Sequence, residues 1–374
     1  MLDAARLLGN EQVLRVVDLG AADGVNSCGL IRDLAEQRAG RRLVYALVDL
    51  PTNAWGVARE HLRHAFDEAA DGSGVVVIPA PGDAGPGVAD VGTGSHYSSP
   101  EAHSEACHRA FEHSPPPATV ISMAGIPLER EPSLPPGSVH IAVSGTTMHW
   151  VADAAGLAST GSVFPGDPDH VDEAERRAWG MGPGRSASVA SAARDARDGA
   201  RPGGRFIAAL PASPAPSAER TGIYVEIVGD MNGLLADWRE TGRISAATVA
   251  AVVVPVWMRT LDEIRYPFEA GGGCVAGLEL ETAELFRLDN LYWHDDPAVF
   301  ARDYVRSVLA WGGPLLHRAF AREGEDRAPG LLAAFLEELE ERVADAPERY
   351  RWDYIEALVI FRKADGTEPN RTRR

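Results

Sequence analysis

A glycine-rich turn follows the first apolar segment of the chain. Its sequence is Asp18-Leu-Gly20-Ala-Ala-Asp-Gly24. Glycines between a strand and a helix let a ligand approach the backbone, and the helix N-terminus favours a negative group. A dinucleotide site would carry Gly-x-Gly-x-x-Gly, whereas the spacing here is Gly-x-x-x-Gly after an acidic residue. This favours a zwitterionic ligand, with Asp18 near an ammonium group, directly or through water, and the amides of residues 24–27 near a carboxylate.

A second acidic residue, Asp49, ends the next apolar segment. A carboxylate there can accept two hydrogen bonds from a ribose diol, and Leu50 would then lie beside an adenine ring. The alternative is that Asp49 is an N-cap or a turn residue ahead of Pro51. Because S-adenosylmethionine carries an ammonium group, a carboxylate and a ribose, the turn and Asp49 together predict that this molecule is the cofactor.

His149 and Trp150 are candidates for binding a second ligand. An indole N–H is a donor that stays protonated near neutrality, and its ring also excludes water. The alternative for Trp150 is a core residue, and His149 is equally interpretable as a second donor or as a buried structural histidine. Trp257 is a candidate apolar wall. The sequence has no HExxH, CxxC or EF-hand spacing, so we expect no metal site.

Strands that alternate with helices must position these residues. We predict strands at 13–19, 43–48, 75–78, 119–123, 138–144 and 205–210, helices at 25–37, 54–69 and 169–199, and a final antiparallel strand at 354–362. This order predicts an α/β fold with a doubly wound, Rossmann-like sheet. We assign residues 1–245 to that core, 246–345 to a mainly helical cap over the substrate pocket, with 248–288 as part of it, and 346–374 to the final strand and tail.

The composition of the chain restricts the partners that it can bind and the cellular compartment that we expect for it. The formal net charge is −18, which repels phosphate backbones and anionic lipid, so we expect neither nucleic acid nor membrane as a partner. No apolar run approaches the roughly 20 residues that a bilayer span requires. The three cysteines are scattered, which excludes a disulfide framework and fits a reducing environment. We expect a cytoplasmic protein.

Several segments of the chain, taken together and in their order along it, resemble the SABATH carboxyl methyltransferases. That family includes salicylate, benzoate and jasmonate methyltransferases and bacterial relatives. The segments that carry the resemblance are the glycine turn through Asn26-Ser27, Asp49-Leu-Pro51, Leu134–His140, Ser144-Gly-Thr-Thr-Met-His149-Trp150, Arg201-Pro-Gly-Gly-Arg205, Val254–Glu263, Arg302-Asp-Tyr-Val-Arg306 through Ala319-Phe320, and the closing strand before Lys363. They span nearly the whole chain. The resemblance implies methylation of a small-molecule carboxylic acid and, by analogy, a possible homodimer.

The resemblance also implies roles for single residues. Asp18, Gly20 and Asn26 would line the methionine end of the cofactor, and Ser144 would face it from its strand. Ser122 and Met123 would lie beside the adenine together with Leu50. His149 and Trp150 would form the substrate-side pair, with the Trp150 indole donating to the substrate carboxylate. No catalytic acid or base is expected, because a carboxylate is already ionised at neutral pH.

Three departures from the family pattern keep other functions open. The family's Gly-x-x-x-Tyr lid is not found ahead of residue 13, the excursion at 79–117 is long, and Ser144–Thr147 replaces a Ser-Ser-aromatic run. One alternative is an N- or phenol O-methyltransferase, for which His149 would act as a base. Another is a cofactor-binding protein without activity. The glycine spacing disfavours a dehydrogenase.

Overall fold

The computed structural model describes residues 11–22, 24–37, 41–49, 55–67, 75–78, 119–125, 137–147, 149–150, 199–214, 225–254, 256, 258–269, 275, 277–351 and 354–364. The expected helix at 169–199 lies outside these residues except for its last residue. So do the excursion at 79–117 and both chain ends.

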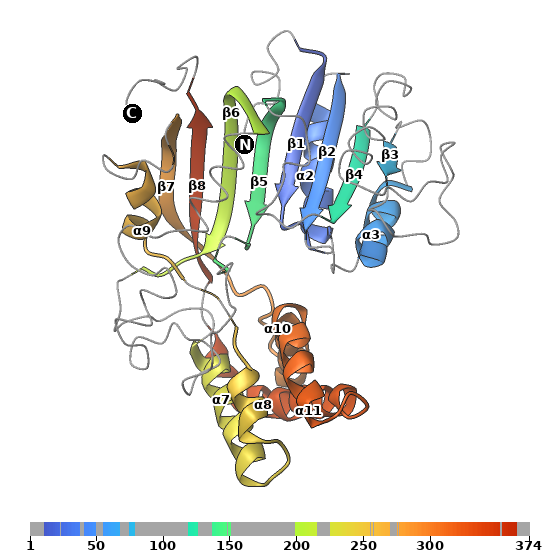
Figure 1. Cartoon of the computed structure of the whole chain (residues 1–374), viewed down its shortest axis with the longest axis vertical. Coiled ribbons are helices and arrows are strands. Elements are labelled where there is room, and N and C mark those ends of the chain that lie inside the picture. The colour runs from blue at the N-terminus through green and yellow to red at the C-terminus, as the bar shows by residue number, and fades with distance from the viewer. Residues whose placement is uncertain are drawn as a thin grey trace, which may run out of the picture.

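An eight-stranded sheet forms the centre of the protein, with strand order β3-β4-β2-β1-β5-β6-β8-β7 (Figure 1). β1 to β6 are parallel where they pair, and β8 is antiparallel to both β6 and β7. This confirms the expected α/β class. The strands are β1 (Val13–Leu19), β2 (Arg42–Asp49), β3 (Val75–Ile78), β4 (Thr119–Gly125), β5 (Val139–Gly145), β6 (Ala200–Pro211), β7 (Leu278–Leu288) and β8 (Tyr354–Lys363).

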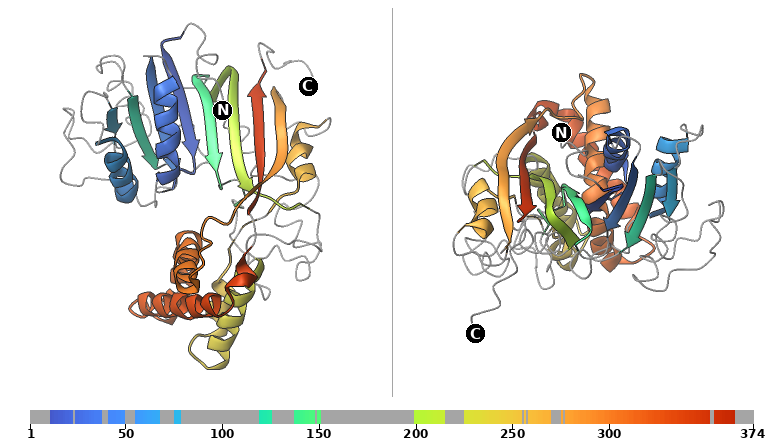
Figure 2. Two further views of the ribbon diagram at one scale, coloured as in Figure 1. Left: turned by 180° about the vertical axis from the view of Figure 1, so that it is seen from behind. Right: turned by 90° about the horizontal axis from the view of Figure 1, so that it is seen from above.

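Both faces of the sheet are buried, as the continuous apolar strands predict. On one face, α2 (Val25–Gln37) and α3 (Trp55–Asp67) pack over β1 and β2 through a core that includes Leu14, Ile31 and Leu62. On the other face, Val17 and the apolar residues of β6 and β8 form a second core, to which α9 (Leu261–Arg265) contributes Ile264. Figure 2 shows the sheet from behind and from above.

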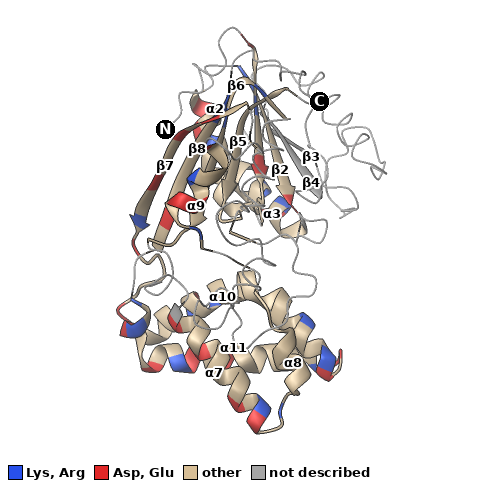
Figure 3. Cartoon of the chain, turned by 60° about the vertical axis from the view of Figure 1, so that its left-hand side comes forward, with Lys and Arg blue, Asp and Glu red and all other residues tan. Residues whose placement is uncertain are grey.

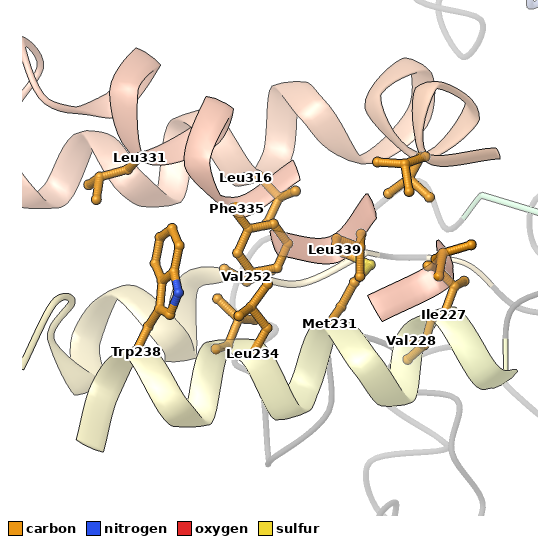
Figure 4. Packing of buried hydrophobic residues seen from close by; sticks show 14 of the residues in the cluster. Ile227, Val228, Met231, Leu234, Trp238, Val252, Leu316, Leu331, Phe335 and Leu339 are labelled. Carbon is orange, nitrogen blue, oxygen red and sulfur yellow. The ribbon is translucent and has the colours of Figure 1, made fainter. Parts of the chain in front are cut away.

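A helical lobe lies beyond the carboxyl ends of the parallel strands (Figures 1 and 2). It consists of α7 (Val225–Glu240), α8 (Ala246–Ala251), α10 (Pro297–Phe320) and α11 (Ala328–Asp345), which share one apolar core. Trp238 packs within this core, with its ring centroid 5.9 Å from that of Phe320 and 5.5 Å from that of Phe335, and Figure 4 shows it beside Leu331 and Phe335. The Trp238 indole donates to Glu338 over 2.8 Å, which satisfies its polar end inside the lobe.

The structure corrects the domain boundaries expected from the sequence. The helical lobe begins with α7 at residue 225 and not at 246. The segment 248–288, expected as a helical cap or insertion, ends in the strand β7, and α9 within it packs on the sheet. The strand at 354–363 is the last of the described strands and is antiparallel, as predicted, and it lies between β6 and β7 in the sheet.

Charged residues of both signs line the exposed edge strand β7 and the outer surfaces of the lobe helices (Figure 3). Across the strands, Arg205 forms a two-pronged pair with Glu281, at 2.8 and 3.0 Å, and Arg362 donates to Glu279 over 2.5 Å. Charges on an edge strand oppose pairing with another chain. Among the described helices, none combines the length and apolar character that a membrane crossing requires.

We predict that Phe335→Ala destabilises the helical lobe by about 3–5 kcal/mol, because its ring is fully buried between Trp238 and Phe320. Urea unfolding followed by circular dichroism measures this change. Leu291→Ala is the control, because that side chain is 79% exposed and its loss should change stability by less than about 0.5 kcal/mol. Equal effects of the two substitutions would contradict the assigned core.

Candidate active site

The glycine turn leaves β1 and is fixed against the end of β2. The amides of Gly20 and Ala21 both donate to the Val48 carbonyl, at 2.7 and 3.2 Å. Gly20 and Gly24 have φ of +79° and +73°, values that glycine adopts without cost. Ala22, between them, also has a positive φ of 48°, which is unfavourable for a residue with a Cβ.

Asp49 contacts this turn directly. Its Oδ2 accepts the Ala22 amide over 2.7 Å, and the residue is half-buried at the last position of β2. The bond ties the strained Ala22 to the neighbouring strand. The glycine turn and the second acidic residue therefore lie together at one edge of the sheet.

Asp18 lies deeper than Asp49, on the face of the sheet that α2 covers. It is 7% exposed, and its Oδ2 accepts the hydroxyls of Ser27 over 2.6 Å and of Tyr45 over 2.8 Å. Burial raises the pKa of Asp18, and these two bonds oppose that rise. Asp18 therefore holds the first turn of α2 in place. Its contact with an ammonium group remains a prediction, as does the role of Asn26, which is exposed at the second position of α2.

The loop after β5 packs on the glycine turn through Thr147, a residue that sequence reasoning did not single out. Its hydroxyl donates toward the carbonyls of Gly145 at 3.0 Å and Gly20 at 3.3 Å. A Cβ on Gly20 would lie 2.0 Å from the Thr147 hydroxyl oxygen, so only glycine fits there. Thr146, the preceding residue, has a positive φ of 52°. Ser144 is 4% exposed near the end of β5.

The same loop carries His149 and Trp150. His149 is 6% exposed, and among the described residues its buried Nδ1 has no hydrogen-bond partner. Burial and then the positive charge of Arg259 lower the pKa of His149 to about 3, so the ring is neutral at physiological pH. Trp150 is half-buried, its ring centroid lies 5.7 Å from that of His149, and its backbone forms a bridge with Val256.

Arg259 is a second residue that sequence reasoning missed, although it lies within the Val254–Glu263 segment. It is 5% exposed, and its carbonyl accepts the amide of Ser213 over 2.9 Å. Burial lowers its pKa to about 10, against the opposing effect of Glu263, so the guanidinium is charged at neutral pH. The only sequence signal was an arginine directly after the apolar run Val252–Met258.

Other expected site residues lie partly or wholly outside what the structure describes. Leu50 and Trp257 are among the residues outside it. Ser122 and Met123 lie in β4 opposite Ala46 and Leu47 of β2, and only their backbone positions are described. No group of three or more metal-ligating side chains that could hold an ion occurs within the described ranges.

Comparison with solved structures identifies the fold. The chain is similar to a loganic acid methyltransferase solved with SAH, with a TM-score of 0.62 and 13% identity over 97% of this chain and 88% of that one. The fold is that of the Rossmann-like class I methyltransferases. Weaker similarities include a SAM-dependent methyltransferase from Methanosarcina mazei (TM-score 0.37, 9% identity, covering 95% and 94%) and a geranyl diphosphate methyltransferase in complex with GPP and sinefungin (0.36, 12%, 96% and 75%). No family model and no curated protein matches the chain.

We predict that Gly20→Ala weakens both stability and ligand binding. The added methyl group collides with Thr147 and forces a positive φ on a residue with a Cβ, at a cost of at least about 1–2 kcal/mol. Thermal unfolding and titration with S-adenosylhomocysteine measure the two effects. Gly29→Ala in α2 is the matched control, since a Cβ there meets nothing within 4 Å and should stabilise the helix by roughly 0.5–1 kcal/mol.

We also predict a contribution of His149 to acid sensitivity. Its pKa is about 3 in the folded chain and about 6.5 when unfolded, so the unfolded state binds the proton between these values. Stability therefore falls as the pH drops below about 6.5, with a slope of up to about 1.4 kcal/mol per pH unit from this residue. Urea unfolding of His149→Gln between pH 4 and 7 should show a shallower slope than wild type. His64→Gln, an exposed substitution on α3, should match wild type.

Proposed function

We propose that this protein is an S-adenosylmethionine-dependent methyltransferase that methylates the carboxylate of a small-molecule acid, and that it is a relative of the SABATH enzymes. The observation that carries the proposal is the contact of Thr147 with Gly20. This contact joins the turn expected to bind the methyl donor to the loop expected to bind the acceptor. The two reactants would thus meet at the carboxyl edge of the sheet, where ligands of open α/β folds bind.

The cofactor assignment is supported by two features of this edge. First, the turn exposes the start of α2 close to a carboxylate on the adjacent strand, an arrangement suited to an amino acid joined to a ribose. Second, Ala22 and Thr146 have positive φ values and lie in the two loops that meet there. Strain of this kind persists where surrounding structure enforces it, and it clusters at ligand sites.

The low basicity of His149 favours a carboxylate as the acceptor. Methylation of a phenol requires a base to take up a proton, and an imidazole with a pKa of about 3 is a weak base. A carboxylate oxygen attacks the sulfonium methyl group directly, with no proton to remove. The chain then needs only to orient the acid and to exclude water. The name of the similar loganic acid methyltransferase agrees with an acidic acceptor.

Incubation with methyl-labelled S-adenosylmethionine and a panel of carboxylic acids, phenols and amines tests the proposal. We expect a labelled product that mild base hydrolyses, as an ester does. A base-stable product would instead indicate N- or phenol O-methylation. Binding of S-adenosylhomocysteine without any transfer would indicate a protein that holds the cofactor but lacks activity.

We predict that Asp49→Ala abolishes cofactor binding. Loss of two ribose hydrogen bonds to a charged group, each about 1.5–3 kcal/mol, raises the Kd by at least about 100-fold. Isothermal titration with S-adenosylhomocysteine measures it. Asp33→Ala, which removes an exposed carboxylate from α2, should leave the Kd unchanged. Wild-type affinity in the Asp49 variant would refute the ribose assignment.

We predict that Trp150→Phe leaves cofactor affinity unchanged but lowers kcat/KM toward the acid about 10- to 100-fold. The substitution keeps an aromatic ring and removes only the N–H that would donate to the carboxylate, a loss of about 1.5–3 kcal/mol. Trp293→Phe removes an indole N–H from the helical lobe and should leave turnover unaffected. An equal loss for neutral and acidic acceptors would argue against a carboxylate contact.

A further inference from the structure

The buried carboxylate beside the glycine turn is hydrogen-bonded through one oxygen only. The Asp18 Oδ2 accepts the hydroxyl of Ser27 over 2.6 Å and the hydroxyl of Tyr45 over 2.8 Å. Among the described residues, these two hydroxyls are the only hydrogen-bond partners of the Asp18 side chain. Burying a charged group is costly unless it is compensated. The second oxygen, Oδ1, therefore remains as an acceptor for a ligand at this edge of the sheet.

Tyr45 donates its bond from the core between the sheet and α2, where its side chain is fully buried. In the parallel pairing of β1 with β2 it stands opposite Val16, whereas Leu47 stands opposite Asp18. The phenol ring therefore extends along the strands to bring its hydroxyl to the carboxylate. Burial, followed by the charge of Asp18, raises the pKa of Tyr45 well above its ordinary value, so this hydroxyl stays protonated and donates.

Ser27 donates the second bond from the first turn of α2. It is 2% exposed, and its amide donates to the Gly24 carbonyl over 3.1 Å, which fixes the residue at the start of the helix. The Asp18 Oδ2 is thus held by two elements at once. Because both donors act on the same oxygen, the carboxylate cannot rotate about its Cβ–Cγ bond without losing both bonds. The direction of Oδ1 is set by the same two contacts.

We propose that Tyr45 and Ser27 are positioning residues, which turn the Asp18 carboxylate so that its Oδ1 binds the α-ammonium group of the methyl donor, directly or through water. This inference rests on the proposed methyltransferase function. The two hydroxyls also favour the ionised carboxylate, because a hydrogen bond to a charged form stabilises that form. They oppose burial and the negative charge of Asp49, both of which raise the pKa of Asp18.

This arrangement makes the amino group of the ligand a recognised feature. An ammonium group offers a positive charge to two carboxylates, Asp18 and Asp49, that act on each other at this edge. A ligand without that group would leave Oδ1 without a donor. We therefore expect S-adenosylhomocysteine to bind at least about tenfold more tightly than its deaminated analogue, in which hydrogen replaces only the α-amino group.

Calorimetric titration of the full chain with these two ligands tests the proposal. Tyr45→Phe keeps the buried ring and removes one donor, so it should weaken S-adenosylhomocysteine binding about three- to tenfold and leave the affinity for the analogue unchanged. Tyr350→Phe is the matched control. That tyrosine is equally buried, but its hydroxyl donates to Asp230 in the helical lobe, so both affinities should stay at their wild-type values.

The pH dependence of binding separates positioning from a purely structural role. The groups that act on the Asp18 carboxyl come from α2 and β2. They are Ser27, Tyr45 and Asp49, and Cys28 in turn acts on Tyr45. Loss of a hydroxyl donor raises the pKa of Asp18, because hydrogen bonds to the ionised form lower it. On acidification, the affinity of Tyr45→Phe for S-adenosylhomocysteine should therefore begin to fall at a higher pH than that of wild type, with no such shift for the analogue.

Ser27→Ala covers the case in which Tyr45→Phe does not fold, and it should show the same selective loss and the same shift with pH. Equal weakening of both ligands would mean that the hydroxyls only support the turn, and it would overturn the inference. Wild-type affinity for S-adenosylhomocysteine in both variants, or no preference of the wild type for the amino group, would overturn it as well. In these cases the proposed function would stand, whereas absence of S-adenosylhomocysteine binding to the wild type would overturn the proposed function itself.

Discussion

The contact between Gly20 and Thr147 is the constraint on which the candidate site depends. The Thr147 hydroxyl occupies the space that a Cβ on residue 20 would need. Two strained residues flank this contact, and each is held by a hydrogen bond from its amide, from Ala22 to Asp49 and from Thr146 to the Ala209 carbonyl. Strain of about 1–3 kcal/mol per residue persists only where neighbours enforce it. These bonds hold the two loops against each other, so the expected donor and acceptor sides of the candidate site would share a common frame.

The local sequence pattern was sufficient to predict elements in the parallel part of the sheet. β1, β3 and α2 have the expected bounds, because an apolar run followed by glycines and an amphipathic stretch leaves few alternatives. β7 was missed because Leu278–Leu288 is rich in leucine and glutamate, which favour helices. Its strand state is stabilised by β8 and by cross-strand pairs with Arg205 and Arg362. Such partners are distant in sequence, so periodicity alone does not identify them.

In the candidate site, too, topology predicts some contacts, whereas others depend on residues that are distant in the sequence. That Asp49 adjoins the glycine turn follows from topology, because parallel strands bring their carboxyl ends to one edge. That Asp18 faces α2 follows from the alternation of β1, in which Leu14 and Val16 pack on that face. Its hydroxyl partners Ser27 and Tyr45, however, come from two other elements. The sequence did not identify Thr147 and Arg259 for a related reason. Thr147 contacts Gly20 and Arg259 acts on His149, and both of these partners lie far away in the sequence.

Charge acts at two distances in this protein. The net charge of −18 would repel an acidic ligand at long range, but at physiological ionic strength the field of surface charges decays within about 8 Å. A buried cation is screened much less than surface charges are, so the guanidinium of Arg259 acts at short range on the His149 ring. The same burial keeps His149 neutral, which leaves its ring able to donate to an anion without adding a second charge. An acidic surface is therefore compatible with the carboxylate acceptor that we propose, because salt and solvent screen the surface charges.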